Sequence, residues 1–462
     1  MKEIILLIDI GSTFTKVTAV DMKEEKILAT ARAFTTVATD VNEGLDKAVA
    51  LIKEQIGDFE PTKRLAASSA AGGLKMISIG LVPELTVKAA KTAALSAGAK
   101  LAGSYSFALC DDEAEEIAGI RPDIVLLSGG TDGGNTEVIL HNAKMLADIP
   151  LNFPVVVAGN KKCAKECEEI ITASGKTAYV TENVMPAFNK LNIIPAQDVI
   201  RSVFLERIIK AKGITKIAGL IEGIIMPTPS AVLKAATLLA KGTEISEGIG
   251  DLILVDMGGA TTDVYSVCKG KPTNASAVMK GLPEPYSKRT VEGDLGARYT
   301  AESVVEAYGM KKFCLKSGLS EEEVNGFFEK IRKDKSYIAS TEKEIAFDKS
   351  VAGAAVELAV TRHAGTLESF YTCNGIMFMQ TGKDLSNVKT VIGTGGPIIG
   401  KDYAAEVLSG AKYDPAVSES LRPKEPEYYI DRKYVFAAMG LLSELYPETA
   451  LKILKEDTIR IG

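Results

Sequence analysis

The amino-acid sequence predicts an α/β protein built from two similar halves. Strand-like apolar segments alternate with segments of helical periodicity, which favours α/β layering over a helix bundle or a β-sandwich. In two places a buried-type strand ends in an acid, which is followed by a glycine-containing turn and another strand. The two acids, Asp9 and Asp256, are 256 − 9 = 247 residues apart. We therefore expect each half to present an equivalent strand–turn–strand unit to one ligand.

Length and one glycine-rich segment predict the division into domains. A chain of 462 residues is too long for one ordinary domain. The polar segment 241–250 (KGTEISEGIG) is the best candidate for a hinge, because the strand–turn–strand pattern starts again after it. We predict an N-terminal half over 1–245 and a C-terminal half over 246–462.

The elements of the N-terminal half are predicted from local patterns. Apolar residues between positions 45 and 52, for example, recur at helical spacing. The expected order is strands 3–10, 14–21 and 26–34, helices 42–56 and 84–98, a strand at the start of 123–135, a strand and helix over 153–171, a strand over 177–183, and a helix over 226–240 with Thr228 as its cap and Pro229 in its first turn.

The C-terminal half repeats this strand, glycine turn and strand arrangement. We expect it over 251–281, followed by a charged helical stretch over about 301–345, a long helix over 348–370, a strand, glycine loop and helix from 388, a strand over 428–431 and an apolar helix over 434–445.

Composition excludes several classes of partner and location. The 54 basic and 60 acidic residues give a net charge of −6, and no dense basic stripe is present, so we expect no nucleic-acid or anionic-membrane partner. The apolar start meets Asp9 too early for a signal peptide, and no apolar stretch approaches 18 residues. These features predict a cytoplasmic protein.

Cysteine and histidine usage argues against a disulfide framework or a metal centre. Six cysteines are few for a chain of this length. Cys163 and Cys167 are four apart and could form half of a metal or iron–sulfur site, but no matching pair exists elsewhere, so ordinary small buried residues are favoured. His141 and His363 are the only histidines, and neither has a carboxylate at ligand spacing.

The two glycine turns are predicted to bind phosphate. A strand-to-strand turn with glycine at its tip brings backbone N–H groups close to an anion, because no Cβ blocks the approach. Asp9 and Asp256 would repel phosphate directly, but they fit if Mg²⁺ with its waters lies between carboxylate and phosphate. The predicted contacts are Gly11, Ser12, Thr13 and Lys16 from the first turn, and Gly258, Gly259, Ala260, Thr261 and Thr262 from the second. The alternative for each turn is an ordinary hairpin with a turn-favouring aspartate.

A third glycine loop follows a later strand. The stretch VIGTGGPII over 391–399 contains Gly393, Gly395 and Gly396 between an apolar strand and an expected helix. Glycines without side chains would allow a nucleoside base and ribose to lie flat against the backbone of this loop. Glycines are, however, common in strand–loop–helix connections.

The order of these three loops resembles the actin, hexokinase and heat-shock-chaperone ATPase superfamily. The resemblance spans nearly the whole chain and implies an actin-like ATPase fold, with two similar α/β domains, each with a central mixed sheet, around a cleft that holds Mg·ATP or Mg·ADP. The helix around Phe436–Leu442, with Gly440, resembles the connecting helix of that superfamily.

Six motifs resemble one family more closely. DIGSTFTKVTAVD, ASSAAGGLKM, LLSGGTDGGN, VDMGGATTDVYS, TVEGDLGARY and VIGTGGPI are similar to the MutL/GlmL family, which is unrelated to the mismatch-repair protein of that name. Family members accompany adenosylcobalamin-dependent mutases and aminomutases, such as glutamate mutase and ornithine aminomutase. The resemblance implies an ATP-driven reactivating chaperone that exchanges damaged cobalamin for intact cofactor. The sequence leaves open which mutase is the client and whether a small second subunit takes part.

Three of these motifs extend beyond the expected nucleotide contacts. Superfamily ATPases place a residue that orients water between the two phosphate loops in sequence, so Asp132 and Glu137 are candidates, while loop capping is an equal alternative for Asp132. Residues 68–73 fit either a functional loop or a tight turn. Segment 290–299, with Glu292, Asp294 and Arg298, either lines the site or caps the following helix.

Three other functions fit the same fold. A small-molecule kinase needs a catalytic base, for which Asp263 is a candidate. An activase of a radical 2-hydroxyacyl-CoA dehydratase needs cluster thiolates, for which only the pair Cys163 and Cys167 is near. A nucleotide-gated scaffold that forms filaments needs no separate client.

Overall fold

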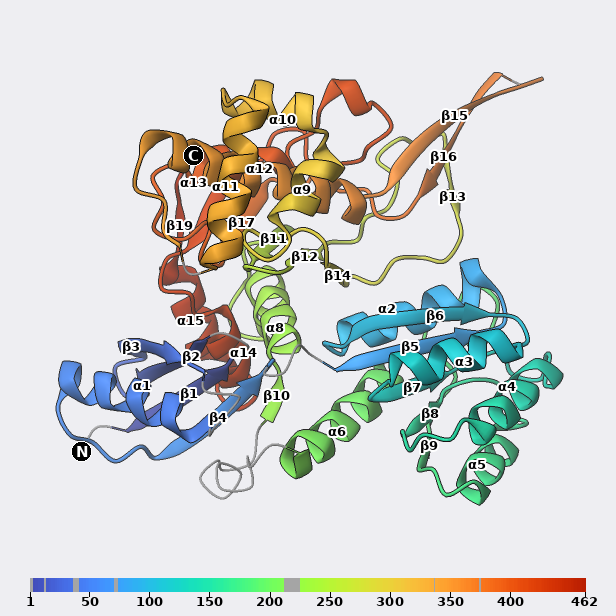
Figure 1. Cartoon of the computed structure of the whole chain (residues 1–462). Helices are drawn as coiled ribbons and strands as arrows, with labels where there is room; N and C mark the ends of the chain where they lie inside the picture. The colour runs from blue at the N-terminus through green and yellow to red at the C-terminus, as the bar shows by residue number, and fades with distance from the viewer. Residues whose placement is uncertain are drawn as a thin grey trace. The chain divides into compact units, whose positions relative to one another are not determined.

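The computed structural model describes seven stretches of the chain, shown in Figure 1. They are residues 3–11, 14–35, 41–69, 74–211, 225–335, 337–373 and 375–462. These stretches form two compact units, and neither is continuous in sequence. Unit 1 contains Met1–Ala235, Gly281–Pro283 and Ala437–Ile453, and unit 2 contains Ala236–Lys280, Glu284–Phe436 and Leu454–Gly462.

The first sheet of unit 1 has the order β10-β4-β1-β2-β3. Its strands are β1 Ile4–Ile10, β2 Phe14–Asp21, β3 Lys26–Phe34, β4 Lys63–Ser68 and β10 Ile225–Pro227. The first three strands form an antiparallel meander, and β4 and β10 continue the sheet in parallel with β1. Helix α1 (Val41–Ile56) buries Leu45, Ala48 and Ile52 in the core of the unit, so the helix predicted from this spacing is confirmed.

The sheet of unit 2 repeats this arrangement in the order β14-β12-β11-β17-β18-β19. Its strands are β11 Leu252–Met257, β12 Thr262–Val267, β14 Ser287–Glu292, β17 Thr390–Thr394, β18 Glu427–Asp431 and β19 Thr458–Arg460. Strands β11, β12 and β14 form the antiparallel meander, and β17 and β18 continue in parallel. The expectation of two α/β halves, each with a central mixed sheet, is confirmed.

Both hairpins also have the same register. In β1–β2 the acid Asp9 pairs with Lys16, and in β11–β12 the acid Asp256 pairs with Asp263, so each acid faces the residue seven positions later. Each acid is also the last residue but one of its strand. The equivalence inferred from sequence therefore extends to the pairing of individual residues.

Unit 1 contains a second sheet that local sequence patterns did not separate from the first. Strands β5 Lys75–Gly80, β6 Lys100–Ser106, β7 Ile124–Leu127, β8 Val155–Val157 and β9 Ala178–Val180 are all parallel, in the order β6-β5-β7-β8-β9. Helices α2 (Lys88–Ser96) and α6 (Ile194–Ala211) supply buried residues to one side of this sheet. Helices α3 (Asp111–Ile120), α4 (Glu137–Asp148) and α5 (Ala164–Ala173) cover the other side. Strands buried on both faces, such as β7 and β8, are accordingly apolar throughout.

Helices of unit 2 cover one face of its sheet. They are α9 Ala301–Tyr308, α10 Met310–Ser317, α11 Glu321–Lys333, α12 Glu342–His363 and α13 Ala404–Leu408. Gly309 and Gly318, both at positive φ, divide the predicted charged stretch into three helices. The helix predicted over 348–370 is wrong at its end, because α12 stops at His363 and extended backbone at Ala364 leads into a strand.

The other elements complete the two units. The predicted helix over 84–98 begins as a π-helix, η1 (Pro83–Val87), and continues as α2. Turns, not a helix, follow β17 directly, and α13 begins only at Ala404. Helices α8 (Thr228–Lys241), α14 (Phe436–Leu442) and α15 (Pro447–Asp457) lie near the unit boundaries in sequence. Within the described stretches, no helix has the length and apolar character needed to cross a lipid bilayer.

Candidate functional site

The first candidate turn joins β1 to β2. Asp9 is largely buried because its strand is buried along its whole length, and the Lys16 ammonium lies 3.3 Å from Asp9 Oδ2. The Gly11 N–H donates to the Phe14 carbonyl at 3.0 Å, and a Cβ at Gly11 would lie 2.7 Å from that oxygen. The turn therefore requires glycine at this position. Ser12 and Thr13, which were predicted to contact phosphate, lie outside the described residues.

A residue from the far end of unit 1 completes this cluster. Strands β1, β4 and β10 are parallel, so their carboxyl ends share one edge of the sheet. At that edge the Thr228 hydroxyl donates to Asp9 Oδ1 at 2.6 Å. Sequence reasoning assigned Thr228 to helix capping; in the structure its hydroxyl is directed at the Asp9 carboxylate. No local signal could have revealed this contact, because 219 residues separate the two positions.

The second candidate turn joins β11 to β12. Its carbonyl groups accept hydrogen bonds from residues 297–300. The carbonyl of Gly258 accepts from the Ala297 N–H, and that of Gly259 accepts from the N–H groups of Arg298 and Tyr299. The Thr300 hydroxyl donates to the Ala260 carbonyl at 2.9 Å. These contacts come from segment 290–299 and the residue after it, so this segment supports the turn. Its own charged side chains form ion pairs within unit 2, Glu292 and Asp294 with Arg362 and Arg298 with Asp348.

The N–H groups of the same turn remain available. The Gly258 N–H closes the hairpin on the Thr261 carbonyl at 2.9 Å. The N–H groups of Gly259, Ala260 and Thr261 donate to no acceptor in the described part of the chain. Three successive N–H donors can bind an anion when the carbonyl groups of the same loop are hydrogen-bonded elsewhere, as they are here to residues 297–300. The remaining predicted contact, Thr262, is fully buried and its hydroxyl donates to the Leu295 carbonyl, so that hydroxyl is used inside the unit.

Charged groups share the sheet face with Asp256. Asp263 pairs directly with Asp256 across the two strands, so both side chains lie on one face. Asp263 also forms an ion pair with Arg289 at 2.9 Å. Burial raises the pKa of Asp263, and the neighbouring Arg289 opposes that shift. A carboxylate held this way is poorly placed to act as the kinase base considered above.

The third glycine loop packs against the second turn. Strand β17 lies beside β11, with Gly393 paired to Val255 and Thr394 paired to Asp256. Gly395 has a φ of +98°, and a Cβ there would lie 2.1 Å from the Met257 carbonyl. The loop thus crosses the end of β11 at backbone contact distance.

The three glycines of this loop differ in what surrounds them. Gly393 faces Ile398 and Leu408 in the core, so its small size serves packing. A Cβ at Gly396 would meet open space. Only Gly396 among the three therefore has room beside it for a ligand, while Gly395 is required by the backbone itself.

Asp132 and Glu137 lie in the segment that leads from β7 of the second sheet of unit 1 into helix α4. Asp132 follows β7, and its Oδ1 accepts from the Lys161 N–H at 3.1 Å and from Asn183 at 3.0 Å. Glu137 is the first residue of α4. The structure therefore does not place either residue on the sheet that carries Asp9. The contacts of Asp132 are those of a loop-capping residue, and its role in orienting water stays a prediction.

The described residues form no cluster typical of a metal held directly by protein side chains. They contain no group of three or more histidine, cysteine, aspartate or glutamate side chains that could hold a metal ion. Cys163 and Cys167 are buried, and burial raises the pKa of the Cys167 thiol to about 12. The Asp9 side chain lies next to Thr228 and Lys16, where it could accept hydrogen bonds from the waters of a hydrated Mg²⁺.

Comparison with known proteins identifies a family. The sequence profile described as MutL protein matches residues 5–458. The chain is 49% identical over 458 residues to Protein MutL of Clostridium tetanomorphum, covering 99% of each chain. Among solved structures, it is similar to xylulose kinase from Lactobacillus acidophilus, at 9% identity and a TM-score of 0.39 over 99% of this chain and 92% of that chain. It is also similar to gluconate kinase from the same organism, at 10% identity and a TM-score of 0.38 over 100% and 93%.

Structural likenesses this distant assign no activity. The match to the family profile and the close relative each cover almost the whole chain. The sequence resemblance to this family is therefore confirmed, and the chain belongs to the MutL protein family.

Proposed function

We propose that this protein is an ATP-dependent reactivating chaperone for an adenosylcobalamin-dependent mutase or aminomutase. The observation that supports nucleotide binding most directly is the set of unpaired N–H groups at Gly259, Ala260 and Thr261, next to Asp256. A phosphate group offers the acceptors that these donors lack. The equivalent register of the hairpin at Asp9 supports a matching contribution from unit 1.

In this proposal each aspartate contacts the waters of Mg²⁺ and each turn binds phosphate. Mg²⁺ would neutralise charge on the phosphates when bound. Asp9 and Asp256 would accept hydrogen bonds from its waters, Lys16 would balance phosphate charge, and Thr228 would fix the orientation of the Asp9 carboxylate. The N–H groups of the second turn would stabilise the charge that develops during hydrolysis, because they are fixed in place beforehand.

The client is proposed from family membership. A nucleotide-driven protein acts on a client only if the client binds its ATP and ADP states with different affinity. The proposed client is the mutase carrying damaged cobalamin, which the chaperone would release so that intact cofactor can bind. An accompanying small subunit is compatible with this role.

A reactivation assay tests this function. Glutamate mutase and ornithine aminomutase would each be inactivated by turnover or oxygen and then incubated with the chain, Mg·ATP and fresh adenosylcobalamin. Recovery of mutase turnover that depends on the chain and on hydrolysable ATP is the expected result. No recovery with either enzyme, together with phosphate transfer from ATP to a small metabolite, would favour the kinase alternative.

A further inference from the structure

Unit 2 carries a small sheet that stands apart from its main sheet. Strands β13 (Ala277–Lys280), β16 (Gly375–Thr381) and β15 (Thr366–Thr372) form this sheet in that order, which we call the β-arm. In Figure 1 the β15–β16 hairpin extends away from the helices and the six-stranded sheet of the same unit. Neither the core of unit 2 nor the proposed nucleotide contacts use its outer part.

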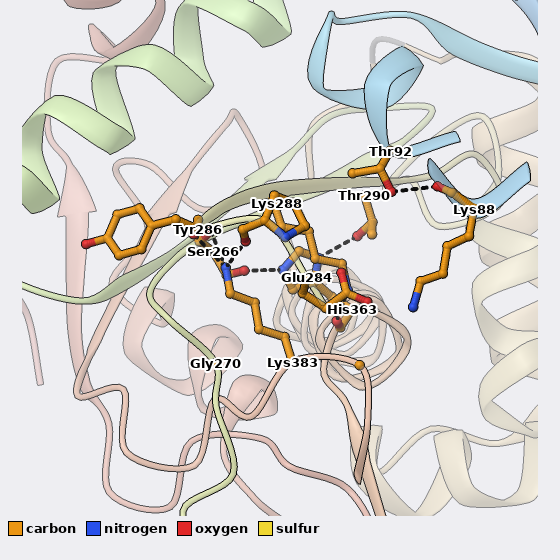
Figure 2. A network of polar contacts seen from close by, with 12 residues as sticks. Lys88, Thr92, Ser266, Gly270, Glu284, Tyr286, Lys288, Thr290, His363 and Lys383 are labelled. Carbon is orange, nitrogen blue, oxygen red and sulfur yellow. Dashed lines mark hydrogen bonds and ion pairs between the residues drawn. The ribbon is translucent and has the colours of Figure 1, made fainter. Parts of the chain in front are cut away.

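The base of the β-arm is fixed by buried polar contacts (Figure 2). Lys383, two residues after β16, is fully buried, and its ammonium donates to the carbonyls of Ser266, Pro285 and Tyr286 at 3.1, 3.0 and 2.7 Å. A Cβ at Gly270 would lie 2.1 Å from the Lys383 side chain, so the lysine stem fills the space beside that glycine.

A second buried side chain ties the last part of β16 to the same region. Gln380 is fully buried, and its amide donates to the carbonyls of Gly270 and Gly382, each at 3.0 Å. Buried donors that are paired with backbone carbonyls, as the Lys383 ammonium and the Gln380 amide nitrogen are, favour one arrangement of the backbone. The β-arm is thus held in a defined position at its base.

The outer part of the β-arm exposes apolar side chains on both faces. Phe370 pairs with Met377 on one face, and Tyr371 pairs with Ile376 on the other, because successive residues of a strand point to opposite sides. All four are exposed, and Tyr371 has 87% of its surface accessible. Val278 and Met279 on β13 are exposed as well.

The β-arm also carries little charge. Lys280 and Glu368 are the only charged residues in its three strands. At the start of β15, Thr366 and Leu367 are bonded to residues near Ser420, which ties this end of the strand to the rest of unit 2.

The distribution of apolar groups indicates the kind of occupant. A second copy pairing edge to edge through β15 would leave both apolar faces bare, and one stacking on a face would cover only that face. A groove in another protein covers both faces and the edge together. Tyrosine, phenylalanine and methionine are enriched at such interfaces, and an occupant with few charges matches the outer part of the β-arm, where Phe370, Tyr371, Ile376 and Met377 lie.

We propose that the β-arm inserts into a charge-poor groove of the client enzyme and is the main docking element of this chaperone. The inference rests on the proposed function for the identity of the client. The proposed docking surface is separate from the residues proposed to contact the nucleotide.

Affinity measurements with purified glutamate mutase and ornithine aminomutase test this proposal. A variant with Phe370→Thr, Tyr371→Thr, Ile376→Thr and Met377→Thr removes apolar surface but keeps β propensity. We expect its affinity for the mutase to fall at least tenfold, with Mg·ADP affinity unchanged. Leu315→Gln is the matched control, because Leu315 lies on α10 of the same unit and is also 87% exposed.

A single-site measurement keeps the test valid if the fourfold variant folds poorly. A photoreactive benzoylphenylalanine at position 371 should crosslink to the mutase, whereas one at position 315 should not. Equal mutase affinity of wild type and the fourfold variant would overturn the docking proposal and leave the chaperone function standing. Failure of the wild type to bind either mutase would overturn the chaperone function and the docking proposal together. If sedimentation shows that the chain forms dimers and that the fourfold variant does not, the partner of the β-arm is a second copy of the chain, and the proposal that it binds the client is overturned.

Discussion

The hydroxyl of Thr228 donates a hydrogen bond to Oδ1 of Asp9 over 2.6 Å, while Lys16 approaches the other carboxylate oxygen. Thr228 is the first residue of α8 and Asp9 is near the end of β1. The contact fixes the rotation of a carboxylate that is proposed to orient the waters of Mg²⁺.

Substitution of Thr228 should therefore affect hydrolysis more than binding. We expect Thr228→Val to lower the kcat of ATP hydrolysis about 10- to 100-fold, because hydrogen bonds to charged groups contribute roughly 1.5–3 kcal/mol. The KM for ATP should change little, and Thr228→Ser should restore the rate. Steady-state kinetics of the wild type, Thr228→Val and Thr228→Ser provides the test. An unchanged kcat in Thr228→Val would show that the contact has no role in hydrolysis.

Asp256 gives a second, independent test of the site. We expect Asp256→Asn to reduce ATP hydrolysis by about 10²–10³, since removal of well-placed electrostatic stabilisation commonly costs that much in rate. Nucleotide binding should survive in part, because the N–H donors of the second turn are unchanged. Single-turnover phosphate release measures the rate, and an unchanged rate would mean that Asp256 only shapes the turn.

Gly440 marks a close helix crossing inside unit 1. A Cβ at Gly440 of α14 would lie 1.9 Å from the carbonyl oxygen of Ala231 on α8. We expect Gly440→Ala to destabilise the fold by roughly 3 kcal/mol through overpacking. Gly326→Ala is the control, because Gly326 lies inside α11 and a Cβ added there would meet no atom of another element within 4 Å. Gly326→Ala should raise the free energy of unfolding by about 0.5–1 kcal/mol. Denaturant unfolding of both variants measures these changes, and equal effects of the two substitutions would contradict the close helix crossing.

The pH dependence of stability should report His363. Its ring is fully buried between the hydroxyls of Thr290 and Ser266 (Figure 2), and burial, with Lys288 and Lys383 nearby, lowers its pKa well below the usual value of 6.5. The unfolded chain takes up this proton below pH 6.5 and the folded chain does not, so stability is lost as pH falls through that range.

The slope attributable to His363 should approach about 1.4 kcal/mol per pH unit. Chemical unfolding of wild type and His363→Gln between pH 5 and 7 measures it, because every other group titrates in both proteins. Parallel stability curves for the two proteins would contradict the low pKa.

Local patterns predicted much of the fold. The strands of the β1–β2–β3 meander were predicted within one residue, and the β11–β12 hairpin lies inside the segment predicted for it, because apolar runs and glycine turns are local signals. Sheet membership was not predictable in this way. The strands from β5 to β9 read like those of the first sheet, and only long-range pairing separates them.

The site was predictable only in its turns. The acids and glycines stand out in sequence, whereas the approach of Thr228 to Asp9 and the support of the second turn by residues 297–300 depend on tertiary packing. The β-arm was missed for a related reason. The helix over 348–370 was extended through Phe370, but extended backbone at Ala364 ends α12 and β15 begins at Thr366.

Nucleotide binding by the two hairpins is the central claim, and thermal unfolding with Mg·ADP tests it most directly. A ligand at 100 times its dissociation constant stabilises the folded state by about 2.7 kcal/mol. We predict a saturable rise in the unfolding temperature of the wild type, and a smaller rise in Asp9→Asn and Asp256→Asn. No shift with millimolar Mg·ADP or Mg·ATP in the wild type would contradict the account.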